Sequence, residues 1–504
     1  MKTKKSSKKV HILDTTLRDG EQTSGIAFRE HEKLAITRSL LLDAKVNAIE
    51  VASARVSDAE LKAVKIICDW AKTAGLVDKI EVLGFVDKNE SVDWINKTGC
   101  KNINLLCKGS LNHLKEQLKK TPEQHIKDIN EVILYAQSLG IKANIYLEDF
   151  SNGIINSPDY VYFMIDNIKN ANRIMLPDTL GIWTPDETYK YLKEVSDKYP
   201  DITFDFHGHN DYGLATANCL AAIKAGIKWV HVTINGLGER AGNSSLASVV
   251  ASIHDHTDHK TDINEKKLRS LSKVVQLISG FRVAANTPVI GENVFTQTCG
   301  VHADGDKKAN LYFNKLLPER FGRKRNYALG KTSGKASIQK NLEVLGIELD
   351  KEDILKVLKR VVELGDKKEN INLSDLPYIV SDVLGTPLKE KVKIINFSME
   401  LNYKKDPKAE IEIEIEGNKY KKSATGDGQY SAFMNAIKAI YKEQKRKFPD
   451  LVDYTVAIPP GGKPDALVET TITWNSEDPF KTKGVDSDQT TAAIKATINM
   501  LNQL

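Results

Sequence analysis

Short apolar runs rich in β-branched residues alternate with longer segments of helical periodicity along the first half of the chain. Eight such runs occur, and a plausible helix follows each of them, for example at residues 31–43 and 216–225. This alternation is typical of parallel strands joined by helices, and eight units in about 250 residues predict a closed (β/α)8 barrel. The expected strands are ILDTT, AIEVAS, IEVLGF, INLLC, ANIYLED, RIMLPDT, ITFDFHGH and WVHVTING.

The pattern changes twice after the barrel. First come helical patterns interrupted by a basic, glycine-containing segment, which predict a helical linker region and not a second sheet. Farther on, strict alternation in IEIEIE places Ile411, Ile413 and Ile415 on one face of a half-exposed antiparallel strand. Strand-like runs before a glycine-led helix occur twice, so we expect a C-terminal α+β domain of two βββα units. The predicted domains are a basic tail (1–9), the barrel (10–256), the linker (257–386) and the C-terminal domain (387–504).

Composition narrows the class of protein. The 504 residues carry a net charge of +5, so nothing in the balance requires a nucleic-acid partner. No apolar stretch reaches the about 18 residues of a membrane span, and the N-terminus lacks a hydrophobic signal core. We therefore expect a cytoplasmic protein that does not use a membrane. The five cysteines are scattered without CxxC spacing and are expected to be thiols.

Polar residues gather where the predicted strands end, which is where barrel enzymes carry their catalytic groups. His207 and His209 are two residues apart on a strand, so both imidazoles lie on one face. With Asp19 after the first strand and Asn243 in the last loop, they predict a mixed nitrogen and oxygen metal site that suits Mn, Zn or Mg. A hydrogen-bonded cluster without metal is the alternative. Thr179, after the sixth strand, is expected to contact the substrate.

Two further inferences concern the surroundings of this predicted metal. GLGERAGN, from Gly236, matches a dinucleotide fingerprint, but it follows the eighth strand and opens no new βαβ unit. It is better explained as a tight loop that lets Asn243 reach the metal. A metal that chelates a 2-oxo acid would polarise its carbonyl, and Arg18 would then stabilise the developing alkoxide. The alternative for Arg18 is a plain salt bridge to Asp19 or Glu148.

Four separated motifs carry a resemblance to a known family. LDTTLRDGEQTSG, LPDTLG, HGHND and NGLGERAGN resemble the Claisen-condensing acyltransferases that include 2-isopropylmalate, homocitrate and citramalate synthases. The resemblance runs over nearly the whole chain. It implies transfer of an acetyl unit from acetyl-CoA to a 2-oxo acid, followed by hydrolysis of the thioester. Matched residue by residue, it implies metal binding by Asp19, His207, His209 and Asn243, oxyanion stabilisation by Arg18, and an active-site acid at Glu148.

The linker carries a second matched group. His302, Asp304, Asn310 and Tyr312 match positions that the family associates with acetyl-CoA and the final hydrolysis, commonly delivered from the partner subunit. The resemblance therefore implies proton transfer at the thioester by His302 and Tyr312. An ordinary loop contact is the alternative for both residues.

The resemblance also indicates which 2-oxo acid accepts the acetyl unit. VLGFVD, NLLCKGS and IYLEDFSNG resemble the citramalate synthases of the family, which implies that Leu83, Leu106 and Tyr146 surround the methyl group of pyruvate. Packing of the barrel core is the alternative for these three side chains. The implied activity is synthesis of (R)-citramalate and CoA for isoleucine formation. The alternatives are a 2-isopropylmalate synthase that uses 2-oxoisovalerate, a metal-dependent lyase or aldolase, and a non-catalytic amino-acid-binding regulator.

The C-terminal domain adds a regulatory expectation. Its pair of βββα units resembles the allosteric domain of the same family, whose usual effector is the branched-chain amino acid at the end of the pathway. The resemblance implies a homodimer that binds isoleucine, or leucine as second choice. Lyases and aldolases that share the metal barrel generally lack this domain, which argues against that alternative.

Overall fold

The computed structural model describes residues 9–307, 311–366, 371, 373–385, 390–457, 468–475 and 480–503. The chain divides into two compact units, one made of Met1–Phe295 and Phe313–Arg325, the other of Thr296–Tyr312 and Asn326–Leu504. The predicted domain limit at 256/257 falls inside the first unit, and the limit at 386/387 lies outside the described residues. Both limits stay predictions.

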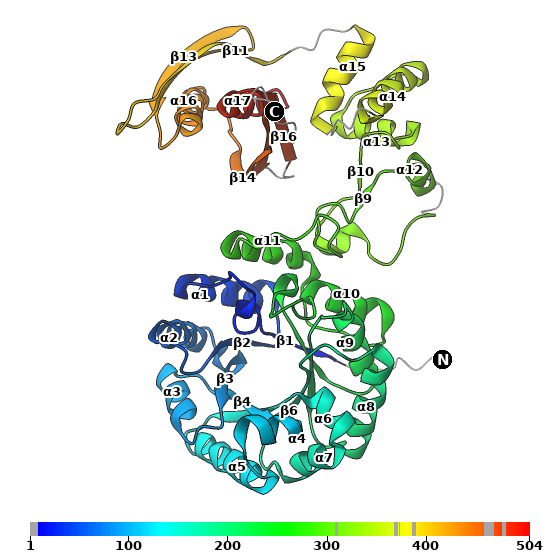
Figure 1. The fold of residues 1–504 in the computed structure, drawn as a ribbon. Coiled ribbons are helices and arrows are strands. Elements are labelled where there is room, and N and C mark those ends of the chain that lie inside the picture. Colours follow the sequence, from blue (N-terminus) through cyan, green and yellow to red (C-terminus); the bar gives the residue numbers. More distant parts are fainter. Residues whose placement is uncertain are drawn as a thin grey trace. The chain divides into compact units, whose positions relative to one another are not determined.

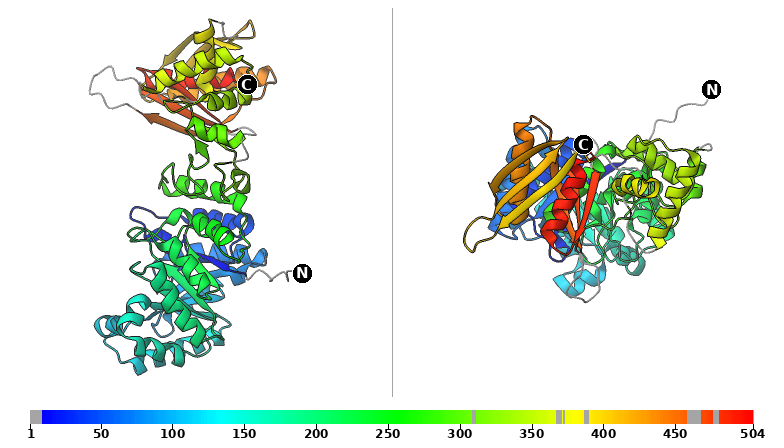
Figure 2. Two further views of the ribbon diagram at one scale, coloured as in Figure 1. Left: turned by 90° about the vertical axis from the view of Figure 1, so that its right-hand side faces the viewer. Right: turned by 90° about the horizontal axis from the view of Figure 1, so that it is seen from above.

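The first unit contains a closed parallel barrel in which strands β1 to β8 pair in chain order, as the sequence predicted. Figure 1 looks into this ring of strands and shows the helices outside it, and the left view of Figure 2 shows the same barrel from another side. The strands are β1 (His11–Asp14), β2 (Ala48–Ser53), β3 (Ile80–Phe85), β4 (Asn102–Lys108), β5 (Lys142–Glu148), β6 (Arg173–Asp178), β7 (Phe204–Gly208) and β8 (Trp229–Val232).

One main helix follows each strand of the barrel. Two of these helices, α5 and α8, begin with a threonine cap, a proline in the first turn and a Gln or Glu that completes a capping box. The helices of this unit are α1 (Glu30–Arg38), α2 (Asp58–Thr73), α3 (Glu90–Thr98), α4 (Leu111–His113), α5 (Pro122–Ser138), α6 (Phe150–Asn156), α7 (Pro158–Asn167), α8 (Pro185–Lys198), α9 (Ala215–Lys224), α10 (Leu246–His256) and α11 (Leu268–Ser279).

Alternation along the strands separates two environments. On β4, for example, Ile103 and Leu105 belong to the large apolar core shared with the helices, whereas Asn104 and Leu106 occupy the alternate positions. Leu106 packs instead against a small apolar cluster inside the barrel, formed by Leu13, Ala48, Leu83, Tyr146 and Met175. The outer core therefore holds the helices in place, while the interior positions are available for a site.

The second unit begins with helices and one very small sheet. Helices α13, α14 and α15 share a core of their own. The sequence predicted no sheet here, but two-residue strands β9 and β10 pair in parallel, a pairing too short to leave a hydrophobic pattern. The elements are β9 (Thr296–Gln297), α12 (Gly300–Lys307), β10 (Asn326–Tyr327), α13 (Lys335–Leu345), α14 (Lys351–Asp366) and α15 (Leu376–Leu384).

The chain ends in two βββα halves, which confirms the predicted pair. Each half is an antiparallel sheet covered on one face by its own helix (Figures 1 and 2). Ile411, Ile413 and Ile415 are buried on the covered face of β12, as their alternation predicted. The elements are β11 (Val392–Glu400), β12 (Lys408–Ile415), β13 (Asn418–Thr425), α16 (Gln429–Glu443), β14 (Asp450–Ala457), β15 (Val468–Asn475), β16 (Phe480–Asp486) and α17 (Gln489–Leu501).

Two composition-based expectations can be checked on the described part of the chain. All five cysteines are free thiols, four of them buried. No helix among the described residues is long and apolar enough to cross a membrane.

A buried lysine fastens the loop that follows β1. Lys33 of α1 is 0% exposed, and its ammonium group lies 2.7 Å from Glu21 and 2.8 Å from Glu60. The same nitrogen donates to the carbonyl oxygens of Leu17, at 3.2 Å, and Val51, at 3.4 Å. Because Glu21 and Leu17 belong to the loop after β1 whereas Val51 and Glu60 belong to β2 and α2, this one side chain ties the loop to its neighbours.

We predict that Lys33→Met lowers the free energy of unfolding by about 3 kcal/mol, because it leaves two carboxylates without their buried partner. Lys62→Met is the matched control, since the pair of Lys62 with Glu30 has side chains 66% and 35% exposed and is worth at most about 1 kcal/mol. Urea unfolding of both variants, followed by circular dichroism, compares them. Equal losses would show that Lys33 contributes no more than a surface ion pair.

Candidate active site

Three buried side chains converge at one end of the barrel. Asp19 follows β1, His207 lies in β7, and His209 comes directly after β7. Asp19 Oδ2 lies 3.3 Å from His207 Nε2 and 3.9 Å from His209 Nε2, and the two Nε2 atoms are 3.3 Å apart. One ligand atom from each residue thus falls within 4.8 Å of the others. This is the spacing that a single metal ion requires.

Asn243 joins this group through a glycine-rich turn. The backbone of Asn243 forms an isolated antiparallel bridge with His209, and its Nδ2 donates to Asp19 Oδ1 at 3.0 Å. The turn reaches this position because Gly238 has φ +155°, and a Cβ there would lie 2.1 Å from Asn243 Nδ2. Only glycine permits so close an approach, which agrees with the predicted tight loop.

Charges around the cluster set its protonation. Burial raises the pKa of Asp19, but the Arg18 guanidinium and His207 outweigh burial and hold that pKa well below its usual range. Burial and the neighbouring His207 lower the pKa of His209 to about 4. At neutral pH the cluster therefore offers a carboxylate and an unprotonated imidazole, which are the forms that bind a cation.

The residues fit a divalent metal. Both hydrogens of Asn243 Nδ2 are used, by Asp19 Oδ1 at 3.0 Å and by the Leu237 carbonyl at 3.1 Å. The amide oxygen of Asn243 is buried and has no hydrogen-bond partner among the described residues. An uncompensated buried oxygen beside a carboxylate and two imidazoles is a donor set that Mn, Zn or Mg accepts.

Arg18 lies beside this cluster and is held on three sides. Its Nε donates to Glu50 Oε2 at 2.6 Å, one terminal nitrogen donates to Asp19 at 2.9 Å, and the other donates to the Tyr146 hydroxyl at 3.4 Å. The predicted alternative of a salt bridge to Asp19 is thus present, whereas Glu148 pairs with Lys108. Remaining N–H groups of the guanidinium are available to a substrate oxygen.

Sequence reasoning missed Glu50, although it is the nearest partner of Arg18. Glu50 is 0% exposed, in the middle of β2. The burial raises its pKa, but the charge of Arg18 outweighs this and lowers the pKa below the usual value. The signal was a single carboxylate inside the apolar run AIEVAS, which indicates a buried and therefore paired charge.

The three side chains expected around the methyl group of pyruvate, here called the wall residues, come together inside the barrel, and Tyr146 among them contacts Arg18. Leu83 and Tyr146 belong to the apolar cluster inside the barrel, and Leu106 packs against it. The Tyr146 hydroxyl lies 2.9 Å from His231 Nδ1. This arrangement fits both predictions made from the sequence for these residues, a wall around a small apolar group of the substrate and packing of the barrel core.

The other predicted barrel residues lie at strand ends. Glu148 ends β5 and forms an ion pair with Lys108, the last residue of β4. The Thr179 hydroxyl accepts a hydrogen bond from the backbone N–H of Asp149 at 2.9 Å, so it braces the neighbouring loop. Its own hydrogen remains available to a ligand. Both positions are at the same end of the barrel as the cluster, because they follow the carboxyl ends of parallel strands.

The predicted acetyl-CoA residues belong to the second unit. His302 and Asp304 lie on α12, and the rings of His302 and Tyr312 are 4.2 Å apart between centroids. Asn310 lies outside the described residues. The two residues expected to handle protons are therefore neighbours of each other.

Comparison with known families covers almost the whole chain. The family described as HMGL-like matches residues 9–275. The homocitrate synthase post-HMGL domain-like family matches residues 289–369. The family described as the LeuA allosteric (dimerisation) domain matches residues 370–504.

Full-length relatives carry two different names. The chain is 34% identical to a 2-isopropylmalate synthase of Methanocaldococcus jannaschii over 98% of this chain and 95% of that protein. It is 31% identical to the (R)-citramalate synthase CimA of the same organism, over 98% of this chain and 99% of that protein. The similar identities do not separate the two names.

We predict that His209→Ala weakens Mn²⁺ binding by about 100-fold or more, because loss of a ligand exceeds the effect of losing an outer-shell partner. Isothermal titration of the metal-stripped protein with MnCl₂ measures this. His31→Ala, at an exposed position on α1, is the control and should bind Mn²⁺ like the unmodified protein. Unchanged affinity in His209→Ala would contradict the site.

Proposed function

We propose that this chain, which belongs to the acetyl-CoA-condensing family of 2-isopropylmalate and (R)-citramalate synthases, joins the acetyl unit of acetyl-CoA to pyruvate. The products are (R)-citramalate and CoA, and one water is consumed. The observation that carries the choice of pyruvate is the cluster of Leu83, Leu106 and Tyr146 beside Arg18. In this proposal the three bulky side chains surround the methyl group of the acceptor and disfavour an isopropyl group.

In this proposal Asp19, His207, His209 and Asn243 hold the divalent cation. When bound, the cation polarises the carbonyl of a 2-oxo acid that chelates it. Arg18 supplies a fixed positive charge, and its remaining N–H groups donate to the oxygen on which negative charge develops as the new C–C bond forms. The guanidinium needs no reorganisation at that moment, because Glu50 and Tyr146 already hold it.

Proton transfers are assigned to side chains outside the metal cluster. The methyl group of the acetyl unit loses a proton as its carbon attacks the keto carbon, and the resulting alkoxide gains one. Glu148, at the end of β5, is the candidate carboxyl group on the barrel for these transfers. His302 and Tyr312 are the candidates for the hydrolysis of the thioester, in which water adds to the carbonyl and the CoA thiolate leaves with a proton.

A second acceptor is the strongest alternative. The 2-isopropylmalate synthase named above is about as similar to this chain as the citramalate synthase, so 2-oxoisovalerate remains the competing acceptor. A lyase is disfavoured because the chain carries the LeuA allosteric domain. A non-catalytic regulator is disfavoured because Arg18 and the convergent cluster are both retained.

We predict that the protein releases CoA from acetyl-CoA with a kcat/KM at least about tenfold higher for pyruvate than for 2-oxoisovalerate, the discrimination that a pocket gains from small apolar groups. A thiol-trapping assay with a panel of 2-oxo acids measures it. Preference for 2-oxoisovalerate would overturn the acceptor assignment, and no CoA release with any 2-oxo acid would overturn the activity.

The adjacent leucines of β4 give a matched test of the wall. Leu106→Ala enlarges the interior and should move the kcat/KM ratio toward 2-oxoisovalerate by about tenfold. Leu105→Ala removes the same atoms from the outer core, on the opposite face of the strand, and should cost about 2–5 kcal/mol of stability without changing the ratio. Equal ratios in the two variants would show that Leu106 does not face the acceptor.

We place the amino-acid effector in the C-terminal domain. A pocket of about 510 Å³ opens where α16 and α17 begin, lined by Gly428, Gln429, Tyr430, Ser431, Leu451, Tyr454, Gln489 and Thr490. Backbone N–H groups in the first turns of two helices suit the carboxylate of an amino acid, and Leu451 with the tyrosines suits an apolar side chain. The matching family is described as a dimerisation domain, so we propose a homodimer inhibited by isoleucine, with leucine as the second candidate.

We predict that Leu451→Glu abolishes inhibition by isoleucine and leaves the kcat unchanged, because it puts a charge where the apolar side chain would bind. Val452→Glu is the control, since Val452 is also exposed on β14 but does not line the pocket. Concentration-response curves for isoleucine, leucine and valine measure both variants. Inhibition that persists in Leu451→Glu would place the effector elsewhere.

A further inference from the structure

A chain of polar side chains crosses the interior of the barrel and meets the site at Glu50, the partner of Arg18. It contains one residue from each of seven consecutive strands, and each is at most 5% exposed. The residues are Glu50, Glu81, Asn104, Asn144, Arg173, Asp205 and His231. Apart from Glu50, none of the seven is hydrogen-bonded to the metal cluster or to Arg18 in the described part of the chain, so the proposed reaction gives them no direct role.

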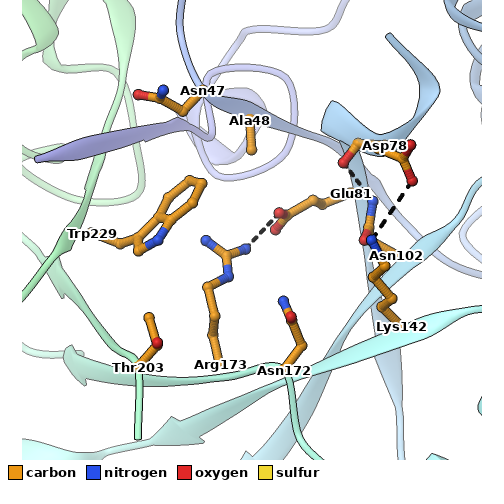
Figure 3. A pocket seen from close by; sticks show the side chains of 10 residues that line it. All are labelled: Asn47, Ala48, Asp78, Glu81, Asn102, Lys142, Asn172, Arg173, Thr203 and Trp229. Atoms are coloured by element: carbon orange, nitrogen blue, oxygen red, sulfur yellow. Dashed lines mark hydrogen bonds and ion pairs between the residues drawn. The ribbon is translucent and has the colours of Figure 1, made fainter. Parts of the chain in front are cut away.

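Arg173 of β6 stands where this chain divides into two arms. Figure 3 shows its guanidinium directed at Glu81, with Trp229 beside it, in a pocket of about 250 Å³. The Arg173 guanidinium lies 2.5 Å from Glu81 Oε1, 3.0 Å from Asp205 Oδ2 and 4.0 Å from the centroid of the Trp229 ring. Arg173 is therefore fixed by two carboxylates and an aromatic face.

The first arm runs through two amides. Arg173 Nε and Asn172 Nδ2 donate to Asn144 Oδ1, at 3.4 and 2.8 Å. Asn144 Nδ2 then donates to Asn104 Oδ1 at 2.8 Å, and Asn104 Nδ2 donates to Glu50 Oε1 at 2.8 Å. Because a donor approaches each amide oxygen from the Arg173 side, each amide must present its N–H groups toward Glu50.

The second arm reaches Arg18 from the other side. The Arg173 guanidinium, 3.0 Å away, favours the carboxylate form of Asp205. In that form Asp205 accepts from His231 Nε2 at 3.1 Å, so the ring proton lies on Nε2 and Nδ1 is an acceptor. The Tyr146 hydroxyl, 2.9 Å from His231 Nδ1, must then donate its hydrogen to that nitrogen. Its oxygen is left with lone pairs toward the Arg18 nitrogen at 3.4 Å.

We propose that Arg173 is a positioning residue, which acts through the Asn144–Asn104–Glu50 arm and the Asp205–His231–Tyr146 arm to present two acceptors to Arg18. The proposal rests on the proposed function, in which Arg18 stabilises the developing oxyanion. Its physical basis is direction: the Glu50 carboxylate is held only while Asn104 donates to it, and the Tyr146 oxygen is an acceptor at Arg18 only while its hydrogen goes to His231. Reversal of one amide would place Asn104 Oδ1 against Glu50 and loosen the guanidinium.

The experiment breaks one arm without changing a charge. Asn144→Leu keeps a similar shape and leaves Asn104 without an imposed direction. It removes the hydrogen bonds of the amide with Arg173, Asn172, Asn104 and Glu81. We expect kcat to fall by about 10–100-fold, the usual effect of losing a group that orients a site residue. The KM for pyruvate should change by less than about threefold, because the metal cluster and the wall residues stay in place.

Asn102→Leu is the matched control. It is the same exchange on the neighbouring strand β4, in the pocket shown in Figure 3. Among the described residues the Asn102 amide donates to the carbonyl oxygens of Asp78 and Ile80, at 3.0 and 2.9 Å, and not to the chain that leads to Arg18. Both variants lose buried hydrogen bonds and should lose thermal stability. Only Asn144→Leu should lose kcat, whereas Asn102→Leu should stay within about twofold of the unmodified protein.

A double-mutant cycle separates positioning from a general structural effect. In an Arg18→Lys background, Asn144→Leu should lower kcat by no more than about a further twofold, because the group it positions is already gone. Arg173→Lys keeps the charge but not the forked geometry, and it should show the same pattern. Arg173→Lys carries the test if Asn144→Leu does not fold.

Two results would overturn the proposal. The first is a kcat of Asn144→Leu within twofold of that of the unmodified protein. The second is a kcat of the double variant that falls by the product of the two single-variant effects, those of Asn144→Leu and Arg18→Lys. Arg173→Lys replaces Asn144→Leu in both comparisons if Asn144→Leu does not fold. A protein that releases no CoA with any 2-oxo acid would instead overturn the proposed function. In that case crystal structures test the inference. The hydrogen bond between Arg18 and Glu50 should be lost in Asn144→Leu, or in Arg173→Lys if Asn144→Leu does not fold, and it should be kept in Asn102→Leu.

Discussion

The ion pair between Arg18 and Glu50 is the constraint on which the rest of the site depends. A buried guanidinium is costly unless its charge and its donors are satisfied, and Glu50 satisfies both at 2.6 Å. The pair joins the loop after β1 to β2, so it requires the parallel register of Leu13 with Ala48. Lys33 holds the same loop from the other side. The position of the guanidinium is thus a property of the fold and not of a mobile side chain.

Asp19 couples that arginine to the metal cluster. One of its oxygens lies 2.9 Å from Arg18 and 3.3 Å from His207 Nε2, and the other accepts from Asn243. A single carboxylate therefore faces a fixed cation on one side and the convergent ligands on the other. Since each positive neighbour favours the ionised form, Arg18 keeps Asp19 ready to bind a cation at acidic as well as neutral pH.

The sequence predicted the barrel and the two βββα units because both have strong periodicity. The barrel strand ends are misplaced by at most two residues, except that the eighth strand was expected to end at Gly236 and ends at Val232. It also predicted which strand ends converge, because parallel strands expose their carboxyl ends on one face. The polar interior was missed. A single Glu81, Asn104 or Asn144 inside an apolar run looks like an exception when strands are taken one at a time. These polar residues are recognised as one network only when strand pairing is known, because the pairing places Asn104 beside Leu83 on one side and Asn144 on the other.

The polar interior also bears on substrate choice, which overall similarity does not resolve. Shape discrimination between a methyl and an isopropyl group works only if the wall does not yield, since displacement of a wall side chain would make room for the larger group. Leu83 and Leu106 are restrained by apolar packing. The hydroxyl of Tyr146 is in addition hydrogen-bonded to His231, which is hydrogen-bonded to Asp205. Swinging the Tyr146 ring aside would break a buried hydrogen bond and leave His231 Nδ1 unsatisfied. The hydrogen-bond network that orients Arg18 therefore also restrains the Tyr146 side chain. Catalysis and substrate selectivity thus depend on the same buried hydrogen bonds.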